Sequence, residues 1–118
     1  MRRATLLLLL LALPLGCATP RSDVFRDETR DIRIDVLNLN FSDATLWALR
    51  GGERIRLGIV RGKQEESFEL SWPVSLPLRV EMDFLAGPRC VTGQLSVDPG
   101  DVIYLELHED PAREFICR

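Results

Sequence analysis

Apolar and polar side chains alternate along the chain after residue 30, with a period of two residues. The alternation is clearest in Arg33 to Val36, Arg54 to Val60, Ser67 to Trp72, Leu78 to Phe84 and Ile103 to Leu107. Glycine, proline and aspartate fall between these segments and provide turn chemistry. No window of similar length favours the period of a helix. The pattern predicts an all-β domain over residues 30–118, a two-sheet sandwich of about seven antiparallel strands.

The stretch LWALRGGERIRLG, residues 46–58, predicts a β-hairpin in which Gly51-Gly52 is a two-residue turn. Counting outward from this turn pairs Arg50 with Glu53 and sorts the side chains into two faces. The expected inward face is apolar and holds Ala44, Leu46, Ala48, Ile55, Leu57 and Ile59. The expected outward face holds Thr45, Trp47, Leu49, Arg54, Arg56 and Gly58. A nucleic-acid-binding Arg-Gly-Gly element is the alternative, but such elements occur as repeats in low-complexity sequence.

The first strand contains two apolar sets in opposite phase. Ile32, Ile34 and Val36 share one phase, and Leu37, Leu39 and Phe41 share the other. The sequence therefore predicts a bulge or a change of sheet near Val36-Leu37. The other expected core residues are Phe68, Leu70, Trp72, Leu78, Val80, Met82, Phe84, Val91, Leu95, Val97, Ile103, Leu105 and Leu107.

Residues 1–16 have the layout of a bacterial export signal. Arg2 and Arg3 precede an unbroken apolar run from Leu6 to Leu13. A membrane span needs about 18 to 20 apolar residues, and this run is shorter. The sequence therefore predicts an exported protein.

The segment LPLGC resembles the lipobox of bacterial lipoproteins, in which the cysteine after a small residue is acylated and becomes the first residue of the mature chain. Gly16 fits this pattern, whereas Pro14 replaces the usual branched aliphatic residue. The resemblance implies lipidation of Cys17 and attachment to a membrane of the bacterial cell envelope, with residues 17–29 as a flexible tether. The alternative is cleavage near Ala18 or Pro20 and free secretion.

Removal of residues 1–16 takes two arginines away and changes the net charge of the chain from −3 to −5. An acidic domain is a poor match for phosphate backbones, which are bound mainly through Lys and Arg. We therefore expect no nucleic-acid partner.

Cys90 and Cys117 are the two cysteines that remain if Cys17 is lipidated. An even number of cysteines in an oxidising compartment favours a disulfide, for which chain entropy predicts about 3.5 kcal/mol of stabilisation. The bridge would also hold the apolar pair Phe115-Ile116 near the domain. Two free thiols are the alternative. We expect no metal site, because two cysteines and one distant histidine do not make one.

His108 is the one histidine of the chain and follows the last expected strand, where it is expected to face solvent. A Ser or Cys nucleophile needs a base and an orienting group, and no GxSxG or similar motif is present. Outward carboxylates such as Glu81 and Asp83 are expected to serve solubility. We therefore expect no enzyme activity and no cofactor.

The outward face of the hairpin is the candidate binding patch: Trp47, Leu49, Arg54 and Arg56. Trp and Arg are over-represented in interface hot spots. The alternative is that Trp47 and Arg56 form a cross-strand cation–π pair worth about 0.5 to 1 kcal/mol and that nothing binds there.

The order NxNFxDATLWALRGGERIRLG, followed by VDPGDVIYLEL, resembles small uncharacterised bacterial lipoproteins with an immunoglobulin-like β-sandwich after the signal. The resemblance implies the architecture alone and transfers no site residues. We expect a non-catalytic envelope lipoprotein that acts as an interaction or accessory module. Its lipid anchor would attach it to a membrane, and its partner would be an envelope protein. A small-ligand or glycan-binding module is the alternative.

Overall fold

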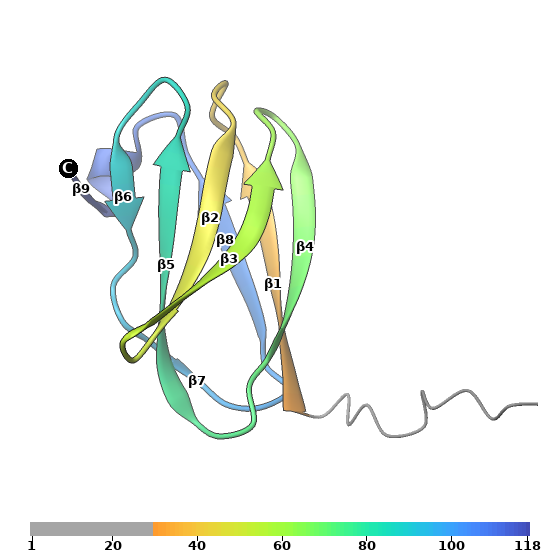
Figure 1. The fold of residues 1–118 in the computed structure, drawn as a ribbon. Helices are drawn as coiled ribbons and strands as arrows, with labels where there is room; N and C mark the ends of the chain where they lie inside the picture. Colours follow the sequence, from red (N-terminus) through yellow and green to blue (C-terminus); the bar gives the residue numbers. More distant parts are fainter. Residues whose placement is uncertain (1–29) are drawn as a thin grey trace, which may run out of the picture.

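The computed structural model describes residues 30–118, which form two β-sheets packed face to face (Figure 1). The expected signal peptide, the lipidation site Cys17 and the tether lie outside the described residues. The strands are β1 (Asp31–Asn38), β2 (Ala44–Arg50), β3 (Glu53–Val60), β4 (Glu65–Ser71), β5 (Leu76–Phe84), β6 (Arg89–Val91), β7 (Leu95–Val97), β8 (Val102–Leu107) and β9 (Ile116–Cys117). A 3₁₀ helix, η3 (Pro111–Arg113), lies between β8 and β9.

Sheet A has the strand order β4-β1-β8, and sheet B has the order β3-β2-β5-β6-β9 with β7 beside β5. The predicted all-β, two-sheet architecture is confirmed. The prediction of about seven antiparallel strands is wrong in two respects, because residues 30–118 form nine strands and β1 runs parallel to β8. The short strands β6, β7 and β9 contain three residues or fewer, too few for a visible alternation. Among residues 30–118, no helix is long and apolar enough to cross a membrane.

The core lies between the sheets and takes every second side chain of the long strands. In β5, for example, Leu78, Val80, Met82 and Phe84 are buried and the residues between them face outward. This is the geometry of a pleated strand with one apolar face. The other buried apolar residues are Ile32, Ile34, Val36, Ala44, Leu46, Ala48, Val60, Trp72, Cys90, Val97, Leu105 and Leu107.

The expected bulge near Val36-Leu37 is absent from β1, whose register with both neighbouring strands is unbroken. The inward phase continues to Asn38, which is fully buried. Its side-chain amide donates to the carbonyl oxygens of Ser42 (2.9 Å) and Val60 (3.1 Å) and accepts from the backbone N–H of Asn40 (3.0 Å). Since these hydrogen bonds satisfy the buried amide, a polar residue occupies a core position that apolar patterning could not identify.

The hairpin register is confirmed near the turn, where Arg50 faces Glu53 and Trp47 faces Arg56. Beyond Trp47 a bulge shifts the register, so that Leu46 pairs with Gly58 rather than with Leu57. The predicted inward position of Ile59 is therefore wrong: Ile59 is exposed and Val60 is buried. In the turn, only Gly51 has a positive φ (58°), as a type II′ turn requires at its first central position.

Gly58 allows β3 of sheet B to lie close to β4 of sheet A. Its φ is +152°, and a Cβ at this position would lie 2.9 Å from the ring carbon Cε1 of Phe68. No other residue type avoids both the conformational cost and the clash. The bulge thus places a glycine where the two sheets meet.

Candidate functional site

The outward face of sheet B contains the candidate binding patch together with side chains of β5 and β6. The register places Trp47 between Arg56 on β3 and Glu81 on β5. It places Leu49 between Arg54 and Arg79 in the next row. The four predicted patch residues, Trp47, Leu49, Arg54 and Arg56, therefore lie together on one face, and whether they bind a partner stays a prediction.

Trp47 is half-buried under the guanidinium group of Arg54, whose carbon lies 4.0 Å from the ring centroid. The same guanidinium donates to the carboxylate of Glu81 at 2.7 Å. Arg54 therefore crosses β2 over the indole ring and reaches β5. The cation–π pair of Trp47 with Arg56, which the alternative interpretation predicts, is wrong. The diagonal neighbour Arg54 covers the ring instead, because the Glu81 carboxylate holds the Arg54 guanidinium there.

Glu81 connects this cation–π pair to β6. Its carboxylate lies 3.8 Å from the guanidinium of Arg89, which also contacts Asp83 at 3.0 Å. The hydrogen bond and the charge of Asp83, with a smaller contribution from Glu81, raise the pKa of Arg89 above its usual value. The centre of the face is thus an internally paired network of arginines, carboxylates and one aromatic ring.

Arg56 and Arg79 stand outside this network. Both side chains are exposed, and neither forms an ion pair with any carboxylate of residues 30–118. Strand spacing and the two-residue offset place their backbones roughly 12 Å apart. Arg79 also lines an open depression of about 320 Å³ that is completed by Leu49, Gly51, Pro77 and Gln94. The rim of the face therefore offers cationic groups that the domain does not use internally.

His108 lies in a different hollow, of about 610 Å³, at the end of β8. It is half-buried, and its Nε2 atom lies 3.3 Å from Glu106 and 3.5 Å from Glu114. The other lining residues are Leu39, Lys63, Glu109, Asp110, Arg113 and Glu114. None of the residues that line this hollow is a serine, threonine or cysteine.

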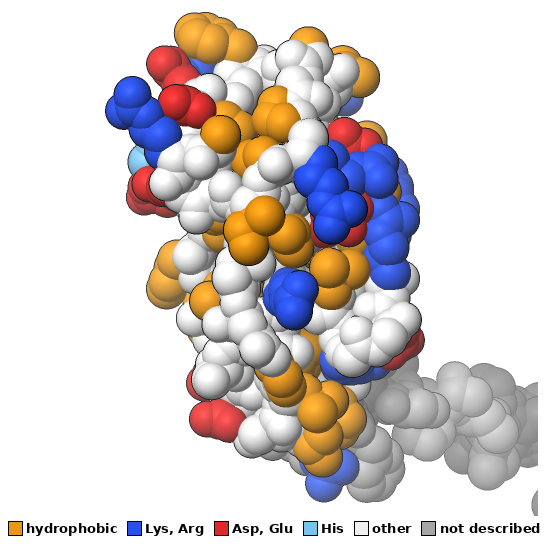
Figure 2. Space-filling model, turned by 90° about the vertical axis from the view of Figure 1, so that its left-hand side faces the viewer, with side chains coloured by type: hydrophobic (Ala, Val, Ile, Leu, Met, Phe, Trp, Pro, Cys, Tyr) orange, Lys and Arg blue, Asp and Glu red, His pale blue; other side chains and the backbone are white. Residues whose placement is uncertain are grey.

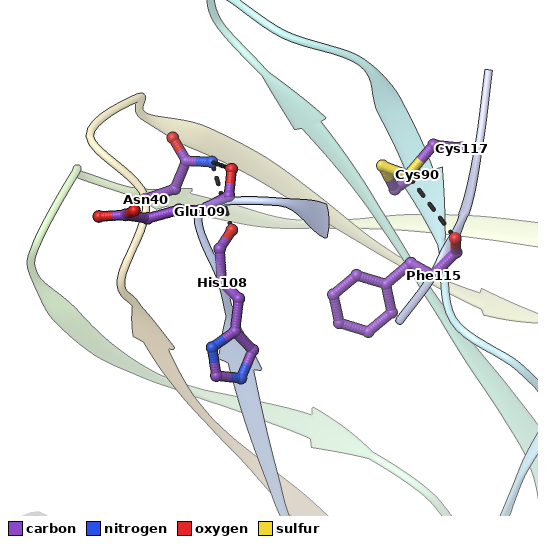
Figure 3. Close-up of a disulfide and its surroundings, with 6 residues drawn as sticks. All are labelled: Asn40, Cys90, His108, Glu109, Phe115 and Cys117. Carbon is purple, nitrogen blue, oxygen red and sulfur yellow. Dashed lines mark hydrogen bonds between the residues drawn. A yellow bond between two sulfur atoms is a disulfide. The ribbon is translucent and has the colours of Figure 1, made fainter. Parts of the chain in front are cut away.

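The predicted disulfide is confirmed: Cys90 of β6 and Cys117 of β9 are directly opposite, with their Cα atoms 4.0 Å apart. Figure 3 shows Phe115 beside the bridge, and its side chain packs against the core. It also shows the Asn40 amide turned toward the carbonyl oxygens of His108 (3.3 Å) and Glu109 (3.4 Å). The bridge fixes the C-terminal segment to the edge of sheet B, and the Asn40 contacts hold the start of the β8–β9 connection. The prediction that Val91 faces inward is wrong, because Cys90 occupies the buried position in β6.

Sequence reasoning located β2 and β3 but missed the contribution of β5 and β6 to this face. The sequence predicts that Glu81 and Asp83 serve solubility alone. It makes no prediction for Arg79 or Arg89. The outward alternation of β5 could have identified these side chains. It could not show that β5 lies beside β2, because the two strands are far apart in sequence and share no turn.

In the described part of the chain, His, Cys, Asp and Glu side chains form no group of three or more suited to a metal ion. No protein-family model, characterised protein or solved structure matches the chain.

Proposed function

We propose that this chain is a non-catalytic, lipid-anchored interaction module of the bacterial cell envelope, with an immunoglobulin-like sandwich. The LPLGC segment supports acylation of Cys17. The Cys90–Cys117 disulfide supports export, because such bridges persist in oxidising compartments. The two-sheet architecture with its hairpins supports the type of sandwich.

The outward face of sheet B is the proposed docking surface, and the unpaired rim arginines are the observation that carries it. Arg56 and Arg79 flank Trp47 and Leu49, which are both half-buried and held in place by the strands. A rigid aromatic group between two available guanidinium groups fits a protein surface that presents carboxylates. The partner is therefore an envelope protein with an acidic patch.

The alternative proposal is a small-ligand or glycan-binding module. The depression beside Arg79 favours it, because Leu49 provides an apolar wall and Gln94 provides a hydrogen-bonding amide. A sugar acid combines the groups that such a site would bind. Titration calorimetry with a uronic-acid oligosaccharide tests this alternative. It requires binding to the wild type and loss of binding in Arg79→Ala.

Crosslinking pull-down from intact cells tests the main proposal. Wild type is compared with Trp47→Ala plus Arg56→Ala, which removes the aromatic group and one rim arginine. We expect the double variant to lose the crosslinked partner. We also expect recovery of the wild-type complex to fall as salt rises, because salt screens contacts between exposed charges.

The matched control is Tyr104→Ala plus Glu106→Ala, which removes an aromatic and a charged side chain from the outward face of sheet A. This control should recover the partner as the wild type does. Identical recoveries from all three proteins would refute the docking surface.

A further inference from the structure

An exposed apolar loop lies at the end of the sandwich where the described chain begins. The β4–β5 connection and the start of β5 present Pro73, Val74, Leu76 and Pro77 to solvent, a set named here the proximal tip. Val74 is 54% exposed and Leu76 is 37% exposed. Figure 2 shows hydrophobic side chains (orange) at the lower end of the molecule, where Figure 1 places the β4–β5 connection, and others at its upper end.

The base of the proximal tip is bonded directly to the first described residue. The backbone N–H of Trp72 donates to the carbonyl oxygen of Arg30 at 2.7 Å. At the same end, the N–H of Gly100 donates to the carbonyl oxygen of Asp31 at 3.1 Å. Any anchor N-terminal to Arg30 is therefore attached at the same end of the domain as the proximal tip, whereas the exposed apolar residues Phe41 and Leu85 lie at the opposite end.

The proximal tip is held in a defined conformation. Trp72 is fully buried beneath it, and its indole N–H donates to the carbonyl oxygen of Val97 at 3.3 Å. The Ser75 hydroxyl donates to Asp98 at 2.5 Å. Pro73 and Pro77 restrict the backbone on both sides. The apolar side chains are thus presented outward by a rigid base and do not fold back onto the core.

We propose that the proximal tip rests in the interfacial region of the lipid bilayer to which Cys17 is anchored, so that the domain stands upright on the membrane. This inference rests on the proposed lipid anchor. The thirteen residues from Cys17 to Thr29 span at most about 45 Å. Such a tether keeps the effective concentration of the tip at the bilayer on the order of millimolar. A small apolar contact that would not bind a free protein to lipid is sufficient under these conditions.

The upright orientation has a consequence for the docking surface. The strands of sheet B then run along the membrane normal, and the outward face with Trp47, Arg56 and Arg79 points sideways, parallel to the bilayer. The partner of the module is therefore a protein that stands on, or projects from, the same membrane.

The test uses the chain from Cys17 to Arg118, the mature form under the proposed function. With Cys90 and Cys117 in the disulfide, Cys17 is the one remaining cysteine. It is coupled to a maleimide lipid in phosphatidylcholine vesicles whose acyl chains are brominated. Chemical coupling makes the result independent of whether cells acylate Cys17, which mass spectrometry of the cellular protein tests separately.

Two tryptophan substitutions report on the two ends of strand β5, in a Trp47→Phe background. Val74→Trp places the probe in the proximal tip. Leu85→Trp is the matched control: Leu85 is 82% exposed and directly follows β5, about 30 Å away along the strand. Any general affinity of tryptophan for lipid affects both variants equally. Emission of the Trp47→Phe parent is subtracted, and urea midpoints equal to that of the parent show that both variants fold.

We expect brominated lipid to quench the added tryptophan at position 74 about twofold, since an interfacial residue lies within about 5 to 10 Å of the acyl boundary. The tryptophan at position 85 should keep its emission. Raising the salt concentration should change neither result, because the contact is apolar. Equal emission at position 74 in brominated and ordinary lipid, or equal quenching at both positions, would overturn the proposal.

Discussion

The outward faces of the two sheets have opposite charge. In sheet A, the strands β1, β4 and β8 carry one arginine, Arg33, which contacts Asp35 at 3.1 Å. Their outward carboxylates are Asp31, Asp35, Glu65, Glu69 and Glu106. In sheet B, four arginines (Arg54, Arg56, Arg79 and Arg89) outnumber the outward carboxylates Glu81 and Asp83. Alternation alone requires polar residues on both faces, so the separation of charge between them is an added property of this chain.

The faces also differ in how their charges are used. On sheet B, Arg54, Trp47 and Glu81 form a network across three strands. On sheet A, the exposed Tyr104 has no cationic partner among the described residues. The comparison indicates that sheet B presents a fixed surface and sheet A an acidic, solvated one.

The edges of the sheets provide the largest expected effect. In sheet B a disulfide cross-links the edge strands β6 and β9, whereas sheet A has no disulfide among the described strands. Cys90→Ala plus Cys117→Ala should lower the free energy of unfolding by about 3.5 kcal/mol, because the unfolded chain regains entropy. Urea unfolding measures this loss. Hydrogen exchange should rise first at β9, and an equal rise in β4 would contradict a role confined to sheet B.

The next largest effect concerns a buried hydrogen bond between the sheets. Asn38 of sheet A donates to the carbonyl oxygen of Val60 in sheet B. Asn38→Ala should cost about 2 to 3 kcal/mol, because it leaves buried carbonyl groups without a partner. Chemical denaturation checks this value, with the exposed Gln64→Ala as the control expected to stay within about 0.5 kcal/mol of wild type. Equal stabilities of the two variants would show that Asn38 does not join the sheets.

A somewhat smaller loss is expected where β3 meets β4. Gly58→Ala places a methyl group against the Phe68 ring and should cost about 1 to 2 kcal/mol. Gly52→Ala is the matched control, since nothing lies within 4 Å of the added carbon there and its φ is not positive. Thermal unfolding of both variants compares them. Equal melting temperatures of Gly58→Ala and the control would mean that the close approach of β3 to the Phe68 ring does not contribute to stability.

The smallest effect distinguishes the two arginines beside Trp47. A double-mutant cycle between Trp47→Ala and Arg54→Ala should give a coupling of about 0.5 to 1 kcal/mol. The same cycle with Arg56→Ala should give a coupling near zero, because Arg54 occupies the ring face. Denaturant titration of the single and double variants provides both values. A larger coupling for Arg56 than for Arg54 would mean that Arg56 is the cation–π partner of Trp47. Arg56 would then not be an unpaired arginine of the docking surface.

The strand alternation and the turn chemistry predicted the two-sheet fold and the hairpin faces near Gly51, and the number of cysteines predicted the disulfide. These features depend on local periodicity or on counting. The bulge opposite Leu46 and Trp47 was not predictable, because Ile59 and Val60 are both apolar and alternation alone does not say which of them is buried. Asn38 was missed for a related reason: its burial depends on carbonyl groups of distant residues.

The sequence placed four residues of the candidate site on one face but predicted neither their contacts nor the side chains of β5 and β6 that complete this face. The register from the turn placed Trp47, Leu49, Arg54 and Arg56 on one face. The selection of Arg54 over Arg56 as the partner of Trp47 depends on Glu81, and strand order in a sheet is not visible in the spacing of the strands along the chain.

Site-specific photo-crosslinking in intact cells tests most directly whether sheet B is the docking face. A benzophenone side chain replaces Arg56 on sheet B in one strain and Tyr104, which is 76% exposed on sheet A, in another. We predict a discrete adduct with one envelope protein from position 56 and no such adduct from position 104. The same adduct from both positions, or an adduct from position 104 alone, would contradict the assignment of the docking surface to sheet B.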